Sequence, residues 1–120
     1  MKVELSRKYN FSAAHYLPNV PERHKCRRLH GHSYDIEIVI RGEVDPAAGW
    51  LMDYGAIDEH VDPVLAEVDH RTLNEIPGLE NATSEHLCGW LWERLKEQLP
   101  GLYRVSVAET CAAACHYYGD

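Results

Sequence analysis

The sequence predicts an α+β domain in which an antiparallel four-stranded sheet carries two helices on one face. Three observations support this fold class. Apolar and polar residues alternate with a period of two over residues 3–15 and again from residue 30, which is typical of half-buried strands. Apolar residues then recur at helical spacing in the middle of the chain, and alternation returns from residue 103. A length of 120 residues suits a single domain, 1–120.

The first two predicted strands place three histidines on their apolar faces. The odd positions of the first strand, 3–15, are mostly apolar and end at His15. In the second strand, His30 and His32 begin a stripe that continues through Tyr34, Ile36, Ile38 and Ile40. Because the loop 16–29 joins these two strand ends, an antiparallel pairing would bring His15 close to His30 and His32.

Two helices are predicted after a turn at residues 45–49. Pro63 lies within the first helix and should kink or break it. Thr83 and Ser84 offer an N-cap for the second helix, and Pro100-Gly101 ends it. The apolar stripes are Ile57, Val61, Val64, Leu65 and Val68 in the first helix, and Leu87, Trp90, Leu91 and Leu95 in the second.

The last part of the chain predicts two more strands. Tyr103, Val105, Val107 and Glu109 alternate with polar or small residues, and residues 112–118 can supply the final strand. A small open sheet leaves two exposed edges, so we expect edge pairing between subunits.

Composition excludes several classes of protein. The net charge of −7 argues against general nucleic-acid binding, and no apolar run is long enough to span a membrane. The N-terminus lacks the apolar stretch of a signal peptide, so we expect a cytoplasmic protein whose four cysteines are thiols. Against this acidic background, Arg23, Lys25, Arg27 and Arg28 form a basic cluster. It would suit a polyanionic small molecule, although a solvated basic loop explains it equally well.

The three histidines predict a metal site. Neutral imidazoles suit Zn²⁺, and a site built from nitrogen ligands disfavours magnesium and calcium. Cys26 leaves two alternatives open. It could complete a closed structural site as the fourth ligand, or it could stand beside an open catalytic site as a reactive thiol. Its cationic neighbours favour the thiolate form that the second alternative needs.

Two further groups could take part in chemistry. Asp69 can orient the ring of His70 and stabilise its charged form, which would make the pair a proton relay. The alternative is a helix C-terminus at which His70 only favours the dipole. Glu109 should point inward, and buried carboxylates are rare without a partner. Either the N–H edge of a 2-amino-4-oxopyrimidine ring or an internal arginine would provide one.

Five motifs occur in order along the chain. They are Phe11-Ser12-Ala13-Ala14-His15, Cys26-x-x-x-His30-Gly31-His32, Asp69-His70, Thr83-Ser84-Glu85 and Glu109-Thr110. Together they resemble the 6-pyruvoyltetrahydropterin synthase superfamily over essentially the whole chain. The short gap between Cys26 and His30 is similar to that of the bacterial 6-carboxy-5,6,7,8-tetrahydropterin synthase branch, since the animal pyruvoyl-forming enzymes carry a longer insertion there.

The resemblance implies a tunnelling fold (T-fold), in which three subunits close a β-barrel and two trimers stack into a hexamer with active sites between subunits. It also implies a zinc-dependent lyase. This enzyme would convert 7,8-dihydroneopterin triphosphate to 6-carboxy-5,6,7,8-tetrahydropterin with release of triphosphate and acetaldehyde, a step toward 7-deazaguanine and queuosine.

The resemblance also assigns roles to individual residues. It implies that His15, His30 and His32 bind Zn²⁺, that Cys26 transfers a proton, and that Asp69 and His70 form its relay. Glu109 would anchor the pterin, and the remaining predicted substrate contacts are Thr83, Ser84, Glu85, Lys25, Arg27 and Arg28. The triphosphate role of the basic residues rests on charge alone. Two other functions stay open: 6-pyruvoyltetrahydropterin formation from the same substrate, and a non-catalytic, zinc-stabilised binding module.

Overall fold

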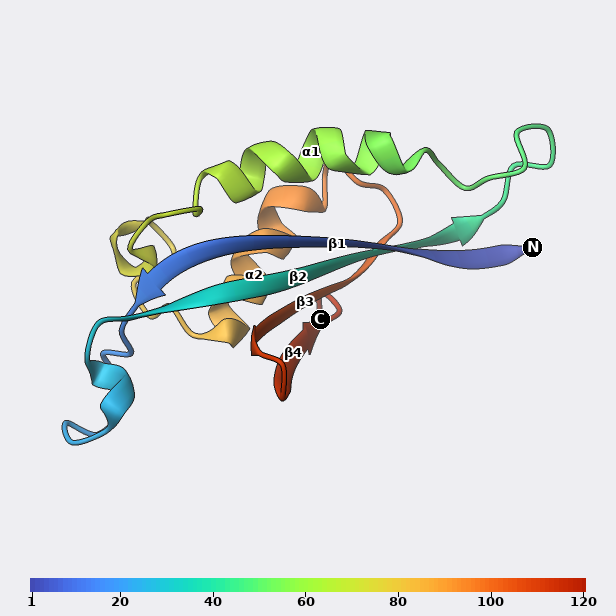
Figure 1. Ribbon diagram of the computed structural model, residues 1–120. Helices are drawn as coiled ribbons and strands as arrows, with labels where there is room; N and C mark the ends of the chain where they lie inside the picture. Colours follow the sequence, from blue (N-terminus) through green and yellow to red (C-terminus); the bar gives the residue numbers. More distant parts are fainter.

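The computed structural model describes all residues, 1–120, and has the predicted order of elements. The four strands form one sheet in the order β1-β2-β3-β4, and every neighbouring pair is antiparallel. Figure 1 shows the two helices on the same side of this sheet. The elements are β1 (Lys2–His15), β2 (His30–Glu43), α1 (Tyr54–Ala66), α2 (Ser84–Leu95), β3 (Leu102–Thr110) and β4 (Ala113–Tyr117). The predicted fold class is therefore confirmed.

The long β1–β2 hairpin places the predicted apolar faces against the helices. Its register pairs Lys2 with Glu43 at one end and His15 with His30 at the other. Tyr34, Ile36 and the apolar residues that follow on β2 are almost fully buried. Because successive side chains of a strand point to opposite faces, this register also places His15, His30 and His32 on the helix-covered face.

Helix α1 begins where Asp53 accepts a hydrogen bond from the backbone N–H of Gly55. Of the kink or break expected at Pro63, the break does not occur, because α1 continues to Ala66. The Pro63 ring is exposed, and proline removes only one backbone donor from the helix. Burial of Val61 and Val64 on either side outweighs that loss, since both side chains belong to the core.

Helix α2 begins at its predicted N-cap. The Thr83 hydroxyl accepts a hydrogen bond from the backbone N–H of His86. Four side chains of α2 pack fully into the core: Leu87, Cys88, Leu91 and Leu95. Trp90 is only half-buried and lies under the guanidinium of Arg94. None of the helices has the length and apolar character needed to cross a membrane.

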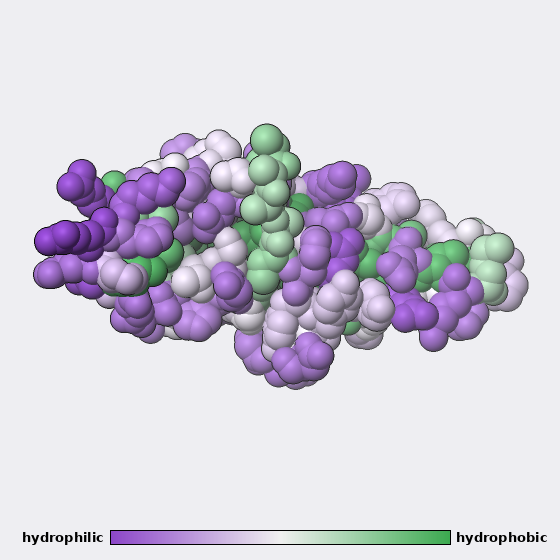
Figure 2. Space-filling model, turned by 90° about the horizontal axis from the view of Figure 1, so that it is seen from below, coloured by the Kyte–Doolittle hydropathy of each residue, from purple (hydrophilic) through white to green (hydrophobic).

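The face of the sheet without helices is polar. Glu37, Ser106 and His116 lie directly opposite one another on β2, β3 and β4. Arg104 bonds to all three of these side chains, and Ser6 on β1 donates to Glu37. Figure 2, viewed from the side away from α1, shows a largely hydrophilic surface with an apolar strip near its middle and smaller apolar patches on either side. The main apolar core therefore lies between the sheet and the helices, while Val39, on the same strand face as Glu37, is buried outside it.

Candidate metal centre and substrate pocket

The three predicted histidines meet at one end of the sheet. One nitrogen of each ring lies within 4.8 Å of a nitrogen of the other two. The ring centroids of His15 and His30 are 4.6 Å apart, and those of His15 and His32 are 5.0 Å apart. His15 ends β1 while His30 begins β2, so the β1–β2 register alone brings these rings together.

Backbone carbonyls fix two of the imidazoles in one tautomer. Nδ1 of His15 donates to the carbonyl oxygen of Ala82 at 2.7 Å, and Nδ1 of His30 donates to that of Arg28 at 2.7 Å. A carbonyl oxygen can only accept, so each ring carries a proton on Nδ1, and Nε2 is the nitrogen left to bind a metal ion. Histidine ligands in metal sites are oriented in this way.

The site leaves nitrogen atoms without partners. Nε2 of His15 and Nε2 of His32 are buried and have no hydrogen bond. Burial lowers the pKa of His15, which favours the neutral, ligating form of the ring. Buried polar atoms of this kind are costly unless something binds them. The donor set therefore fits a zinc ion, which takes neutral imidazole at about 2.0–2.1 Å.

Glu109 points inward, as the alternation of its strand predicts, and lies beside the histidines. Its Oε1 is 4.0 Å from Nε2 of His15, and its Oε2 is 3.7 Å from Nε2 of His32. The Ser84 hydroxyl donates to Oε1 at 2.8 Å. No internal arginine pairs with this carboxylate, whose polar neighbours are Ser84 and the rings of His15 and His32.

The predicted pterin-contacting residues line a pocket beside Glu109. Its volume is about 370 Å³. The lining residues are Ser84, Glu85, Val107, Glu109, Thr110, Ala113, Ala114 and Cys115. Thr83 caps α2 next to this pocket but does not line it. The structure therefore brings Ser84, Glu85 and Glu109 to one cavity at the edge of the metal centre.

Cys26 lies in the loop that joins the metal-binding strands. It belongs to a 3-10 turn, Lys25–Arg27, and its carbonyl oxygen accepts a hydrogen bond from Leu17 at 2.7 Å. The thiol is half-buried and is not a member of the close cluster formed by the three histidines. This arrangement does not make Cys26 a fourth ligand of a closed site.

The basic residues of the same loop are exposed. The guanidinium of Arg27 donates to the carbonyl oxygens of Pro18 and Val20 at 3.0 and 3.1 Å. Arg27 therefore holds the loop together. Lys25 and Arg28 are also exposed, and Arg28 supplies the carbonyl that orients His30.

Asp69 and His70 pair with each other on the far side of β1. Nδ1 of His70 lies 2.8 Å from Oδ1 of Asp69, which also accepts the backbone N–H of Ser12. His70 has a φ of 58°, in the left-handed region, and its backbone N–H donates to Ser12. The chain then runs along the outer edge of β1, where Thr72 forms a parallel bridge with Ala14.

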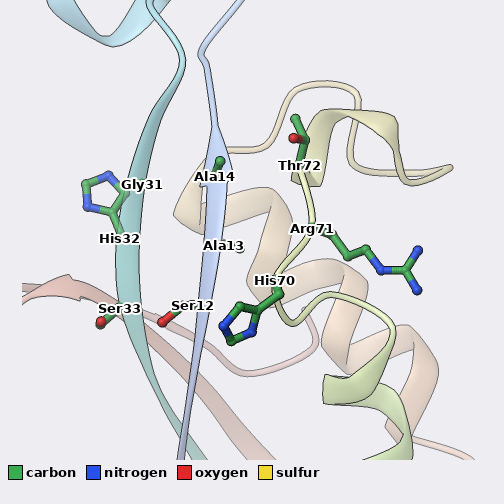
Figure 3. A pocket seen from close by; sticks show the side chains of 9 residues that line it. All are labelled: Ser12, Ala13, Ala14, Gly31, His32, Ser33, His70, Arg71 and Thr72. Atoms are coloured by element: carbon green, nitrogen blue, oxygen red, sulfur yellow. The ribbon is translucent and has the colours of Figure 1, made fainter.

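This segment lines a second pocket, of about 540 Å³. Figure 3 shows the rings of His70 and His32 on opposite sides of the β1–β2 pair. Both His32 and His70 line this pocket, but no hydrogen bond or ion pair joins Asp69 or His70 to the predicted metal ligands of the same chain. The ring of His70 is largely exposed, so it is available to a second molecule.

Sequence reasoning missed two groups at the metal centre. The Tyr34 hydroxyl is buried without a partner, and its ring contacts those of His15 and His32 edge-on. Burial raises its pKa, and the nearby Glu109 raises it further. Tyr34 follows His32 by two positions on the same strand face, so the signal was present. The carbonyl of Ala82 carries no side-chain signal and could not have been found.

Comparison with known proteins places the chain among pterin enzymes. Residues 4–120 match the family model described as 6-pyruvoyl tetrahydropterin synthase. A 6-carboxy-5,6,7,8-tetrahydropterin synthase from Synechocystis is 37% identical over 93% of this chain and 90% of that protein. A dihydroneopterin monophosphate aldolase from Pyrococcus furiosus is 36% identical over 91% of each.

A solved structure agrees with the fold. The 6-pyruvoyl tetrahydropterin synthase of Caenorhabditis elegans superposes with a TM-score of 0.92 at 31% identity, covering 100% of this chain and 97% of that one. The shared architecture is the T-fold predicted from the motifs. A match that extends over almost every residue, joined to the same fold, makes this chain a member of the 6-pyruvoyl tetrahydropterin synthase family.

Proposed function

We propose that this protein is a zinc-dependent 6-carboxy-5,6,7,8-tetrahydropterin synthase. It would convert 7,8-dihydroneopterin triphosphate and one water molecule to 6-carboxy-5,6,7,8-tetrahydropterin, triphosphate and acetaldehyde. The observation that carries this proposal is the convergence of three histidines, of which His15 and His32 have unpartnered Nε2 atoms near a pocket lined by the predicted pterin-contacting residues. A zinc ion held by His15, His30 and His32 would act as a Lewis acid on the hydroxyl groups of the substrate side chain.

The pocket residues would hold the pterin ring. Glu109 is suited to accept hydrogen bonds from the N–H edge of a 2-amino-4-oxopyrimidine, and the hydroxyl of Ser84 keeps its carboxylate in place. Glu85 is the second acidic group that lines this cavity. The basic residues Lys25 and Arg28 are exposed in the loop after β1 and would attract the triphosphate.

Two groups would move protons. The Sγ of Cys26 would take a proton from the side-chain carbon next to the ring and return it as the ring double bond shifts. Nε2 of His70 would exchange a proton with a side-chain hydroxyl. Asp69 bonds to the other nitrogen of this ring at 2.8 Å, so it would orient the imidazole and stabilise its charged form.

The position of the relay supports an active site between subunits. Asp69 and His70 lie across β1 from the metal centre of their own chain. We therefore propose that they serve a neighbouring copy, in a hexamer built from two trimers. The open edges of β1 and β4 are suited to close the β-barrel of such an assembly. A cytoplasmic location and a place in queuosine biosynthesis belong to the same proposal.

Product analysis tests the reaction. The purified protein would be incubated with dihydroneopterin triphosphate, with and without a chelator, and the products would be identified by mass. We expect a carboxypterin and acetaldehyde, formed only without chelator. A pterin that keeps a three-carbon side chain would instead show the 6-pyruvoyl activity, and turnover that survives chelation would refute zinc dependence.

The aldolase relative requires a further arm of the same assay. Its identity to this chain is close to that of the carboxypterin-forming relative, so overall similarity does not separate the two reactions. A parallel incubation would use dihydroneopterin monophosphate. We expect little turnover of the monophosphate, because the basic loop offers more charge than one phosphate requires. Preferential turnover of the monophosphate would contradict the proposed substrate.

A further inference from the structure

The carboxylate of Glu109 faces the two imidazole nitrogens that lack partners. Its oxygens lie 4.0 Å from Nε2 of His15 and 3.7 Å from Nε2 of His32. Four ligands in a tetrahedron around zinc at about 2.0–2.2 Å have their ligating atoms roughly 3.3–3.5 Å apart. Each of these two distances is only about half an ångström longer than the separation between neighbouring ligand atoms.

We propose that Glu109 is the fourth ligand of the metal ion in the substrate-free protein and leaves the ion when the pterin binds. This inference rests on the metal site of the proposed function and adds a resident ligand to it. No single oxygen of Glu109 lies within 4.8 Å of all three histidine nitrogens, so the side chain must turn toward the ion. The side chain is 29% exposed, which leaves it room to do so.

Charge favours this arrangement. Three neutral imidazoles leave both positive charges of a zinc ion uncompensated in a largely buried site, and His15 is only 1% exposed. Glu109 is the only acidic residue in an ion-pair contact with these rings. An anion beside a buried divalent cation gains far more electrostatic energy than the same pair in water.

A second residue prepares the carboxylate for this role. The hydroxyl of Ser84 donates to Oε1 at 2.8 Å, which leaves Oε2 as the oxygen nearer to His32. Hydrogen bonds to ligating carboxylates orient them in this way in metal sites. Cys26 is not part of the cluster, so a carboxylate, rather than a thiolate, is the group positioned to close the site.

As a consequence, the metal ion would have a free coordination position only when substrate is bound. The same carboxylate lines the pocket proposed for the pterin ring, so it can satisfy the ring or the ion, but not both fully. Binding of the ring would draw Glu109 away and free a coordination position as the substrate hydroxyls arrive. Without substrate, the site would stay closed to water and to other oxygen ligands.

Zinc affinity tests the ligand role without any turnover. The zinc dissociation constant would be measured by competition with a chelator for the wild type, Glu109→Gln, Glu109→Asp and Glu97→Gln. We expect about 10- to 100-fold weaker binding in Glu109→Gln, in the range seen when groups that support a metal site are lost. Glu109→Asp should lose a similar factor because its shorter side chain cannot reach. Glu97 is exposed and bonds to nothing, so its variant controls for the change in net charge.

Two results of this measurement would overturn the proposal. Unchanged zinc affinity in Glu109→Gln would exclude coordination. Full affinity in Glu109→Asp together with weak binding in Glu109→Gln would show that the carboxylate acts through its charge at a distance. Each of these results is independent of which pterin reaction the protein performs, so failure of the proposed function would appear only in the product assay.

The visible spectrum of the cobalt-substituted wild type gives a second readout. The probe is pterin without a side chain, which has no side-chain hydroxyl to offer the metal. We expect saturating pterin to change the cobalt spectrum as Glu109 leaves, and pterin fluorescence would report binding independently. A spectrum that stays constant while pterin is bound would refute the displacement.

Discussion

The Nδ1 atom of His15 donates to the carbonyl oxygen of Ala82 at 2.7 Å and so ties the end of β1 to the segment that precedes α2. Sixty-seven positions separate the two residues in the chain. The bond fixes the ring with its lone pair on Nε2, on the same side as His30 and His32. The orientation of a metal ligand on the sheet therefore depends on where the second helix begins.

Replacement of His15 by alanine should abolish zinc binding. Two imidazoles cannot hold the ion as three do, and the deleted ring is almost fully buried. Metal analysis of the purified variant should find less than a tenth of the zinc of the wild type. His60→Ala is the matched control, because His60 bonds to Gln98 away from the cluster. Full zinc content in His15→Ala would contradict its role as a ligand.

Chelation should inactivate the protein without unfolding it. The core is formed by side chains of the sheet and both helices and does not need the ion. Circular dichroism should keep its native form after metal removal, while turnover stops and returns when zinc is added. Cooperative unfolding on chelation would instead favour a zinc-stabilised binding module.

Cys26→Ala should keep its zinc and lose turnover, by about 10²- to 10⁴-fold if the thiol acts as a general base. Zinc content and steady-state rates would be measured on the same preparation. Cys111→Ala is the control, since Cys111 is an exposed thiol in the β3–β4 turn. Loss of zinc in the Cys26 variant would move the thiol into the coordination sphere and exclude this mechanism.

Thr83→Ala should lower the free energy of unfolding by about 1 kcal/mol, the usual cost of a lost N-cap. The hydroxyl that would be removed accepts the backbone N–H of His86 at 3.1 Å. Urea denaturation of the metal-free protein measures the change. Thr83→Ser should retain most of the stability, because its hydroxyl can cap the helix. Equal stability of wild type and Thr83→Ala would show that the cap contributes nothing.

Asp58 should make the protein less stable as the solution becomes acidic. Hydrogen bonds from Arg7 and then Tyr9 lower its pKa from 3.8 to about 2. A carboxyl whose pKa is lower in the folded state stabilises the fold above its unfolded pKa. That contribution is lost as pH falls from about 4 to about 2. The difference in unfolding free energy between wild type and Asp58→Asn should therefore shrink over this range.

Chemical denaturation at several pH values measures the dependence on Asp58. Asp120→Asn is the control, because Asp120 is exposed at the end of the chain. A difference between wild type and Asp58→Asn that stays constant from pH 5 to pH 2 would show that the Arg7 contact does not shift the titration of this carboxyl.

The parts of the site that lie on paired strands could be predicted from the sequence. Period-two alternation predicted that His15, His30 and His32 share one face of the sheet. Antiparallel pairing of the two neighbouring strands then predicted that their rings lie close together. The position of Glu109 could not be predicted so closely. It lies one residue past the last β2–β3 pair, Asp35 with Ala108, in a register that includes an irregularity at Val39 and Ile40.

The position of the predicted relay, Asp69 and His70, was harder to predict from the sequence, because both residues lie in a loop. Nothing in the local sequence of Asp69 and His70 indicates that the chain crosses to the outer edge of β1. That path depends on the left-handed backbone of His70 and on two bonds to Ser12. The path of α1 through Pro63 was likewise decided by packing, since the core residues around it outweigh one missing backbone donor.

The pairing of residues 69–72 with β1 divides the outer edge of that strand into two parts. The outward backbone N–H groups of Ser12 and Ala14 donate to the Asp69 carboxylate and the Arg71 carbonyl oxygen, respectively. The carbonyl oxygen of Ser12 also accepts a hydrogen bond from the backbone N–H of His70. Another strand could therefore add to β1 only along its N-terminal part, before Ser12. Residues 69–72 therefore block strand addition at the end of β1 that carries His15. That end of the strand has no free edge through which another chain could pair and aggregate.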